Sequence, residues 1–301
     1  MAVGPRYDTT LRKNEYEHKA GERKSGMSAA PHLAAYAFGG STMTVLLPGT
    51  ETDGAFALVH IIKGPGSSTP RHMHDSETEI SYVLEGDLAL ETPSGIAHLG
   101  VDEWHVLPPG GMHRLFNESS SAVHELLVCA PAIFDRFVAT AGNPVAPFSA
   151  PEAMTDHARE SISKHAPDFG IRLFRETPKE QLTSTRRVEP ETLDALGGRF
   201  EVLAALSDQD DALVLLRFTL KPGQAMPPSA FADRHALFLV TGQLEMHRDC
   251  SGWQALTPRA AQNVAAGERY ALSNTSGSAA SILVVSTVRF VRLLRASGSA
   301  A

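Results

Sequence analysis

The sequence predicts an all-β protein made of two similar β-domains joined by a short helical linker. Short apolar stretches recur at a spacing of roughly 8–12 residues between Gly and Pro clusters, which is typical of a sandwich or a barrel. Turn residues also recur at a nearly fixed offset of 157 or 156 positions, namely Gly66 and Gly223, Gly110 and Gly267, Asn117 and Asn274, and Gly86 and Gly242. A repeat of this length indicates two homologous domains.

The first domain is expected over residues 31–142. Its apolar stretches predict strands at 42–47, 55–62, 80–84, 88–90 and 123–128. A short helix is predicted at 133–141, because Ile133, Phe134 and Phe137 fall on one face at helical spacing. The polar residues 1–30 that come before this domain lack the apolar core of a signal peptide and are expected to be a loose arm.

Residues 143–195 are expected to form the linker. Residues 143–151 are rich in Pro and Ala, and the polar stretch 151–165 favours a helix that Pro167 and Gly170 end. The second domain is expected over 196–296. Its predicted strands are 200–206, 212–220, 237–240, 243–246 and 281–288.

Composition excludes several classes of function. The chain has 301 residues, 43% of them hydrophobic and 20% charged, with a net charge of −7. A nucleic-acid-binding protein would need a basic surface, so no nucleic-acid partner is expected. No apolar run approaches the roughly 20 residues that span a bilayer, and two cysteines make no disulfide framework. We therefore expect a cytoplasmic protein without a membrane partner.

Four residues in the first domain form a candidate metal site. His72 and His74 are separated by one residue, so on a strand their side chains point to the same side. Glu79 and His113 complete a set of three imidazoles and one carboxylate. This set suits a divalent Fe, Mn, Ni, Co or Zn ion, and such a site would retain a positive charge that attracts an anionic substrate.

Around these residues the sequence resembles the cupin family. Residues 66–86 fit its first motif, Gly-x5-His-x-His-x4-Glu-x6-Gly, at every fixed position. Residues 102–117 fit the second, Gly-x5-Pro-x-Gly-x2-His-x3-Asn, except that Asp102 replaces the leading glycine of a turn. The resemblance implies a bicupin of two jelly-roll barrels, also called double-stranded β-helices. It also implies one metal, held by His72, His74, Glu79 and His113.

The second repeat does not conserve these ligands. At the repeat offset, His72, His74 and His113 correspond to Ser229, Phe231 and Tyr270. The position of Glu79 falls on His235 or Ala236, depending on the offset used. These side chains are not a plausible divalent site, so the second barrel is expected to bind no metal.

Candidate substrate-binding residues follow from strand alternation and from the aromatic content of the first domain. They are His60, Tyr36, Phe38, Trp104 and Leu115. Counting from Glu79, alternation turns Tyr82 away from the interior, where it would serve packing.

Residues 130–144 and the later segment 169–172 resemble the end of small cupins related to quercetin 2,3-dioxygenase. This resemblance implies an oxidoreductase, a mononuclear dioxygenase that acts on an enolic or phenolic small molecule, with Glu79 as ligand and general base. Dioxygen would be the second substrate, iron is slightly favoured, and a homodimer is expected. Two alternatives stay open: a redox-neutral isomerase, epimerase or decarboxylase, and a non-catalytic small-molecule-binding cupin.

Overall fold

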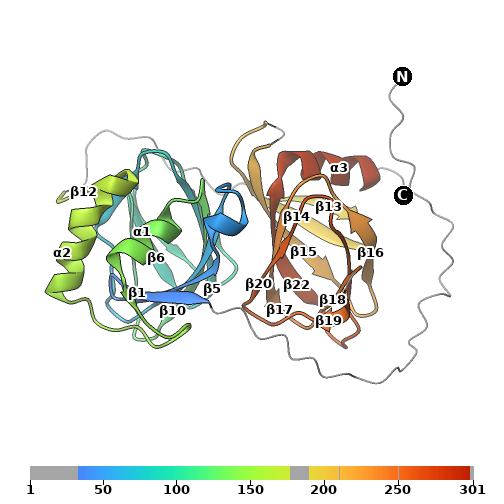
Figure 1. Cartoon of the computed structure of the whole chain (residues 1–301), viewed down its shortest axis with the longest axis horizontal. Helices are drawn as coiled ribbons and strands as arrows, with labels where there is room; N and C mark the ends of the chain where they lie inside the picture. The colour runs from blue at the N-terminus through green and yellow to red at the C-terminus, as the bar shows by residue number, and fades with distance from the viewer. Residues whose placement is uncertain (1–32, 177–189, 210, 250, 299–301) are drawn as a thin grey trace. The chain divides into compact units, whose positions relative to one another are not determined.

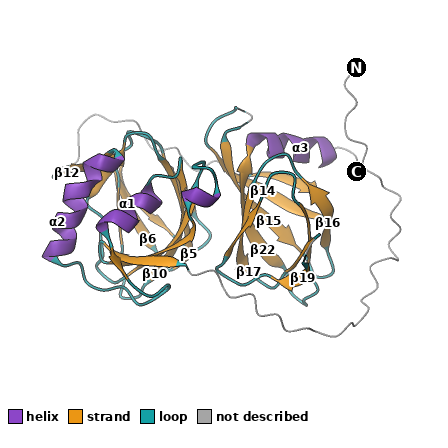
Figure 2. Cartoon of the chain, in the orientation of Figure 1, coloured by secondary structure: helices purple, strands orange, loops and turns teal. Residues whose placement is uncertain are grey.

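The computed structural model describes residues 33–176, 190–209, 211–249 and 251–298. Its strands form two barrels, drawn from blue to green and from yellow to red in Figure 1. Strands dominate both. Among the described residues, two α-helices and two short 3-10 helices, Gly49–Glu51 and Ala166–Phe169, accompany the first barrel, and one α-helix accompanies the second (Figure 2). The predicted all-β class with two jelly-roll barrels is confirmed. No helix in the described ranges is long and apolar enough to cross a membrane.

The first barrel contains β1 to β12. Their bounds are β1 Ala34–Phe38, β2 Ser41–Leu47, β3 Ala57–Lys63, β4 Arg71–His74, β5 Thr78–Glu85, β6 Leu88–Thr92, β7 Gly95–Leu99, β8 Trp104–Leu107, β9 Arg114–Phe116, β10 Val123–Ala130, β11 Asn143–Pro144 and β12 Ile171–Phe174. The described residues form one large sheet in the order β11-β1-β2-β3-β10-β5-β8 and two smaller sheets, β7-β6-β9 and β12-β4. Alternation of side chains along the strands directs every second residue into the barrel.

The second barrel contains β13 to β22, followed by α3 (Val288–Gly298). Its strands are β13 Glu191–Ala195, β14 Gly198–Ala205, β15 Leu213–Leu220, β16 Ala225–Ala230, β17 His235–Thr241, β18 Glu245–Arg248, β19 Gly252–Ala255, β20 Ala261–Val264, β21 Arg269–Ser273 and β22 Ala280–Thr287. Within the described ranges they form two sheets, β13-β14-β15-β22-β17-β20 and β16-β21-β18-β19.

Strand register and turns show that the two barrels are repeats of one unit. In the first barrel β3 pairs with β10 so that Lys63 lies opposite Val123, and in the second β15 pairs with β22 so that Leu220 lies opposite Ala280. Leu220 lies 157 residues after Lys63, and Ala280 lies 157 residues after Val123. Gly66 and Gly223 also match, with left-handed φ angles of 73° and 74° that a residue with a Cβ rarely adopts.

Asp102, the departure from the second motif, sits in a turn as expected. Its φ is 66°, and the residue at the same place in the second barrel, Arg259, has a φ of 62°. An aspartate tolerates this conformation better than most residues with a side chain. The substitution therefore leaves the turn in place.

Residues 143–174, expected to be part of a linker with a helix, pack against the first barrel. After α1 (Phe134–Ala141), β11 pairs with β1, and α2 (Asp156–His165) leads through the 3-10 turn Ala166–Phe169 to β12, which pairs with β4. The segment adheres because Ile162, Ala166 and Ile171 bury apolar surface against the first barrel. The second barrel begins with β13, ahead of residue 196. The arm 1–30 and residues 177–189 of the expected linker lie outside the described residues.

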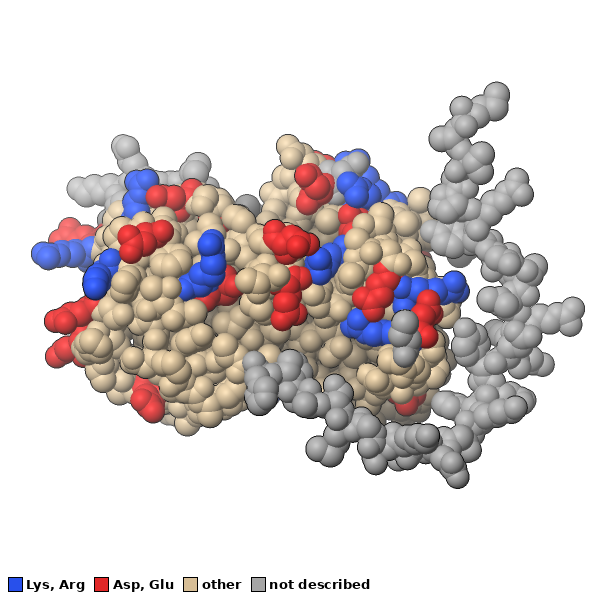
Figure 3. Space-filling model, in the orientation of Figure 1, with Lys and Arg blue, Asp and Glu red and all other residues tan. Residues whose placement is uncertain are grey.

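The two barrels share an apolar cluster formed by the outward faces of their large sheets. The first barrel contributes Leu58, Tyr82 and Trp104, and the second contributes Leu215 and Phe238, among others. The indole N–H of Trp104 donates a hydrogen bond of 2.9 Å to the backbone carbonyl of Leu203. Tyr82 thus faces away from the interior of its barrel, as alternation predicts. On the molecular face shown in Figure 3, acidic and basic side chains are interspersed.

Candidate metal centre and its cavity

The four residues of the motif meet inside the first barrel. His72 and His74 lie on β4, Glu79 lies on β5, and His113 immediately precedes β9. An isolated antiparallel β-bridge pairs His72 with His113 and so joins β4 to the residue that precedes β9. All four side chains are buried, and one ligand atom from each lies within 4.8 Å of the others. Residues that are 41 positions apart in sequence therefore share one site.

Hydrogen-bond partners orient the three imidazoles toward a common centre. His72 Nδ1 lies 2.9 Å from the carbonyl oxygen of Pro70, and His113 Nδ1 lies 3.0 Å from that of Gly111. Because a carbonyl can only accept, both Nδ1 atoms carry the hydrogen and both Nε2 atoms present a lone pair. His74 Nδ1 likewise faces a carboxylate oxygen of Glu77 at 3.0 Å.

The buried atoms at this centre lack the partners that a metal would supply. The Nε2 atoms of His74 and His113 have no hydrogen-bond partner among the described residues. They lie 3.4 Å and 3.2 Å from the two carboxylate oxygens of Glu79. Burying such groups without a partner is costly, whereas a divalent ion would satisfy them together. The residues present therefore fit a mononuclear metal site.

Charges at the centre set the protonation of its members. Burial disfavours the charged form of Glu79, but His74 and His113 outweigh this effect and lower the pKa of Glu79 to about 2. Burial and the neighbouring imidazoles hold the pKa of His72 well below its usual range. Glu79 is therefore an anionic ligand at neutral pH, and His72 is a neutral one.

Glu77 supports the site and was not identified from the sequence. Its side chain is buried, with one oxygen facing His74 and the other accepting hydrogen bonds of 3.0 Å and 2.9 Å from the backbone N–H groups of Ile133 and Phe134. Glu77 thereby connects His74 to the start of α1. A carboxylate in this place fixes the ring orientation of a ligating histidine. Its position three residues after His74 was the available signal.

A small cavity of about 40 Å³ adjoins the centre, and His72 and Glu79 form part of its wall. The rest of the wall is mainly apolar and includes Phe38, Met43, Ile61, Leu115, Leu127 and Phe137. Among the predicted substrate residues, Phe38 and Leu115 lie here. A space of this size holds on the order of three water molecules, so only a small ligand or part of a larger one fits it as it stands.

The other three predicted substrate residues, His60, Tyr36 and Trp104, are not among the residues that line this cavity. His60 is fully buried, but its ring contacts those of His124 and Phe148, each at a centroid distance of 5.3 Å. Alternation along β3 turns its neighbour Ile61 to the cavity instead. Trp104 packs between the barrels. Tyr36 is opposite Pro144 of β11 and packs against the apolar cluster that contains Phe137 of α1.

Several wall residues were not anticipated. Ile162 of α2, and Ile171 and Leu173 of β12, come from the segment that was expected to be a linker, and Phe137 comes from α1 at the end of the expected first domain. Figure 1 shows α1 and α2 beside the first barrel. The apolar face of 133–141 signalled that this helix packs against something, but the sequence did not indicate that it covers the cavity.

Comparison with known proteins identifies this architecture. Residues 59–129, which contain all four candidate ligands, match the model of the Cupin domain family. The first barrel is therefore similar in sequence to the cupin family. No curated protein matches the sequence.

Solved structures share this fold over most of the chain. AerE from Microcystis aeruginosa has 12% sequence identity and a TM-score of 0.51, covering 87% of this chain and 95% of its own. Ylba from E. coli has 11% identity and a TM-score of 0.54, covering 86% and 85%. Oxalate decarboxylase from Bacillus subtilis, described with Mn(II) centres, has 13% identity and a TM-score of 0.56, covering 84% and 74%. At such identities the likeness establishes the fold alone.

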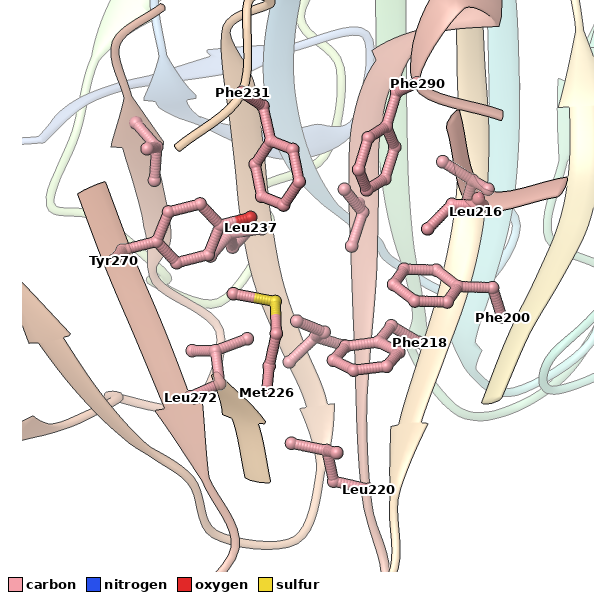
Figure 4. Close-up of a cluster of buried hydrophobic side chains, with 14 of the residues drawn as sticks. Phe200, Leu216, Phe218, Leu220, Met226, Phe231, Leu237, Tyr270, Leu272 and Phe290 are labelled. Atoms are coloured by element: carbon pink, nitrogen blue, oxygen red, sulfur yellow. The ribbon is translucent and has the colours of Figure 1, made fainter. Parts of the chain in front are cut away.

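In the second barrel, side chains fill the place that corresponds to the candidate metal centre. Strand register assigns His235 to the position of Glu79, because His235 pairs with Val264 as Glu79 pairs with Leu107. The His235 ring nitrogen Nδ1 lies 2.8 Å from the hydroxyl of Tyr270, and Phe231 and Phe290 pack against its ring. Figure 4 shows Phe231, Tyr270 and Phe290 converging in the barrel interior.

His235 is expected to make folding stability depend on pH. Burial lowers the pKa of His235 from 6.5 to about 3, so the folded protein keeps it neutral while the unfolded chain takes up a proton. Stability is then lost as pH falls below 6.5, by about 2 kcal/mol between pH 7.5 and 5. Urea unfolding measures the free energy of unfolding at both pH values. Its change between them should be about 2 kcal/mol smaller in His235→Gln than in the unmodified protein. Equal dependence in the two proteins would contradict the assignment.

Proposed function

We propose that this cupin is a mononuclear metal-dependent dioxygenase acting on a small enolic or phenolic molecule. The observation that carries the proposal is the convergence of three imidazole Nε2 atoms and the Glu79 carboxylate beside a small, mainly apolar cavity. The ion would be one divalent transition metal, with iron slightly favoured over manganese, nickel, cobalt and zinc.

When bound, the metal would supply Lewis acidity and a template for the substrate and dioxygen. The residues of the chain do the rest. Glu79 lies in the cavity wall, where its carboxylate can take the enolic or phenolic proton as general base. Apolar side chains such as Phe38, Met43 and Leu127 exclude bulk water from the reacting atoms.

The composition of the wall favours oxygenation over isomerisation or epimerisation. Among the described residues that line the cavity, the titratable side chains are Lys63, His72 and Glu79. A redox-neutral proton shuttle needs both an acid and a base on the substrate, and Lys63 and Glu79 would have to share these roles. Enolate oxygenation needs one proton acceptor, for which Glu79 suffices.

A redox-neutral reaction, such as decarboxylation, is the second candidate. It is supported by the fold shared with oxalate decarboxylase and by the presence of Lys63 in the wall. A non-catalytic binding cupin is the third. A homodimer and a cytoplasmic location belong to the same proposal.

Dioxygen uptake tests the proposal directly. Protein loaded with each of the five metals is mixed with a panel of enols and phenols in an oxygen-electrode cell. We expect uptake with at least one substrate, its loss in Glu79→Ala, and its retention in Ser229→Ala, which changes the matching position of His72 in the second barrel. Equal product formation without dioxygen would instead support the redox-neutral reaction, and binding without turnover would support the binding protein.

A further inference from the structure

A buried polar row lies next to the metal centre inside the first barrel. The Lys63 ammonium lies 3.7 Å from one carboxylate oxygen of Glu125, and the Ser81 hydroxyl donates to the other at 2.5 Å. Lys63 and Glu125 are each at most 1% exposed. Ser81 is two residues beyond Glu79 on β5, so both side chains face the barrel interior.

The same barrel in the second repeat lacks this row. Strand register matches Lys63 with Leu220, Glu125 with Ile282 and Ser81 with Leu237. All three of these residues belong to the apolar core of the second barrel. The architecture therefore does not require polar side chains here, and replacing a buried ion pair with apolar residues is often neutral or stabilising. A role in ligand binding explains why the first barrel carries the row.

The geometry of Lys63 leaves room for such a ligand. A lysine ammonium can donate three hydrogen bonds. The distance of 3.7 Å between Lys63 Nζ and Glu125 Oε2 is longer than a normal hydrogen bond. Lys63 also belongs to the wall of the cavity that His72 and Glu79 line. A ligand in that cavity thus meets the metal centre and Lys63 within one small apolar space.

We propose that Lys63 binds a carboxylate of the substrate, so that the substrate is a small organic acid whose carboxylate is separate from its metal-bound oxygen. The inference rests on the proposed metal centre and narrows the class of substrate. The apolar residues Met43, Ile61 and Leu127 would contact the carbon chain between the two anionic ends. Glu125, held by Ser81, would keep the ammonium in place.

Binding of short diacids tests the proposal without requiring turnover. Malonate, succinate and glutarate are titrated by calorimetry into the full-length zinc-loaded protein, each against its own monoamide. In each diacid one carboxylate can bind the metal and the other can reach Lys63, whereas the monoamide lacks the second charge. At one chain length we expect the unmodified protein to bind the diacid at least about tenfold more tightly than the monoamide.

Two variants separate Lys63 from its neighbour. Lys63→Leu combined with Glu125→Ile copies the residues at 220 and 282, so the barrel should fold, and it should lose the preference for the diacid. Glu125→Gln keeps the cation but removes the charge that holds it in place, so the preference should weaken without being lost. Circular dichroism and zinc content confirm that each protein is folded and loaded.

The possible failures are distinguishable. Azide, which needs only the metal, should bind all three proteins equally. A diacid preference that survives in the double variant, or that appears at no chain length while azide still binds, would overturn the role of Lys63 and leave the metal centre standing. Absence of both zinc and azide binding in the unmodified protein would overturn the metal centre itself.

Discussion

Replacing His113 with alanine is expected to remove most of the bound metal. The substitution deletes one of the four converging ligand atoms. It also removes the imidazole that lies 3.2 Å from the buried carboxylate of Glu79. Losing even an outer partner of a metal ligand costs about 10–100-fold in affinity, so losing a ligand should cost more than about 100-fold. Elemental analysis after dialysis, and competition with a chelator, measure the loss.

Ser229→Ala is the matched control for this experiment. Ser229 pairs with Tyr270 in the second barrel as His72 pairs with His113 in the first. We expect the control to keep about one metal per chain, because the second barrel is filled by Phe231, Tyr270 and Phe290. A full equivalent of metal in His113→Ala would contradict the ligand assignment. Two equivalents in the unmodified protein would contradict the single site.

Trp104→Ala is expected to cause the largest loss of stability among the substitutions considered. The side chain is 6% exposed, packs in the cluster shared by the two barrels, and donates a hydrogen bond to Leu203. Truncating a buried tryptophan typically costs about 3–5 kcal/mol, because both the apolar contacts and the filled volume are lost. Urea unfolding monitored by circular dichroism measures the change, and metal content per folded chain should stay the same.

The other tryptophan of the chain serves as its control. Trp253 on β19 is 39% exposed, and its ring contacts that of His247. Trp253→Ala should change stability by about 0.5 kcal/mol or less, as surface substitutions usually do. If Trp104→Ala were equally mild and instead altered ligand binding, Trp104 would belong to the site after all.

The convergence of the candidate metal ligands could be predicted because it depends on residues that are close in sequence or at fixed motif spacing. His72 and His74 lie on one side of one strand, and Glu79 and His113 follow at fixed motif spacing. The offset between the repeats could also be predicted, and strand register decides that His235 rather than Ala236 replaces Glu79. Few residues other than glycine adopt the left-handed backbone of these turns, so matching glycines reveal the repeat.

The cavity wall could not be predicted to the same degree. All seven residues of β3 are buried, because one face lines the barrel while the other is covered by further protein. Alternation places His60 on one face of β3 and Ile61 and Lys63 on the other. It does not show which of the two faces lines the cavity. Trp104 illustrates the same limit, since the face of the first barrel that carries it packs on the second barrel.

The sequence by itself therefore determined the β-rich double-barrel class, the repeat, and the four residues that converge as candidate ligands. Tertiary structure alone decided that 143–174 closes the first barrel, that Glu77 orients His74, and that Lys63, Glu125 and Ser81 form one buried row. The physical reason is that motif spacing encodes short-range geometry along the strands. Contacts between distant strands depend on which surfaces each barrel must bury.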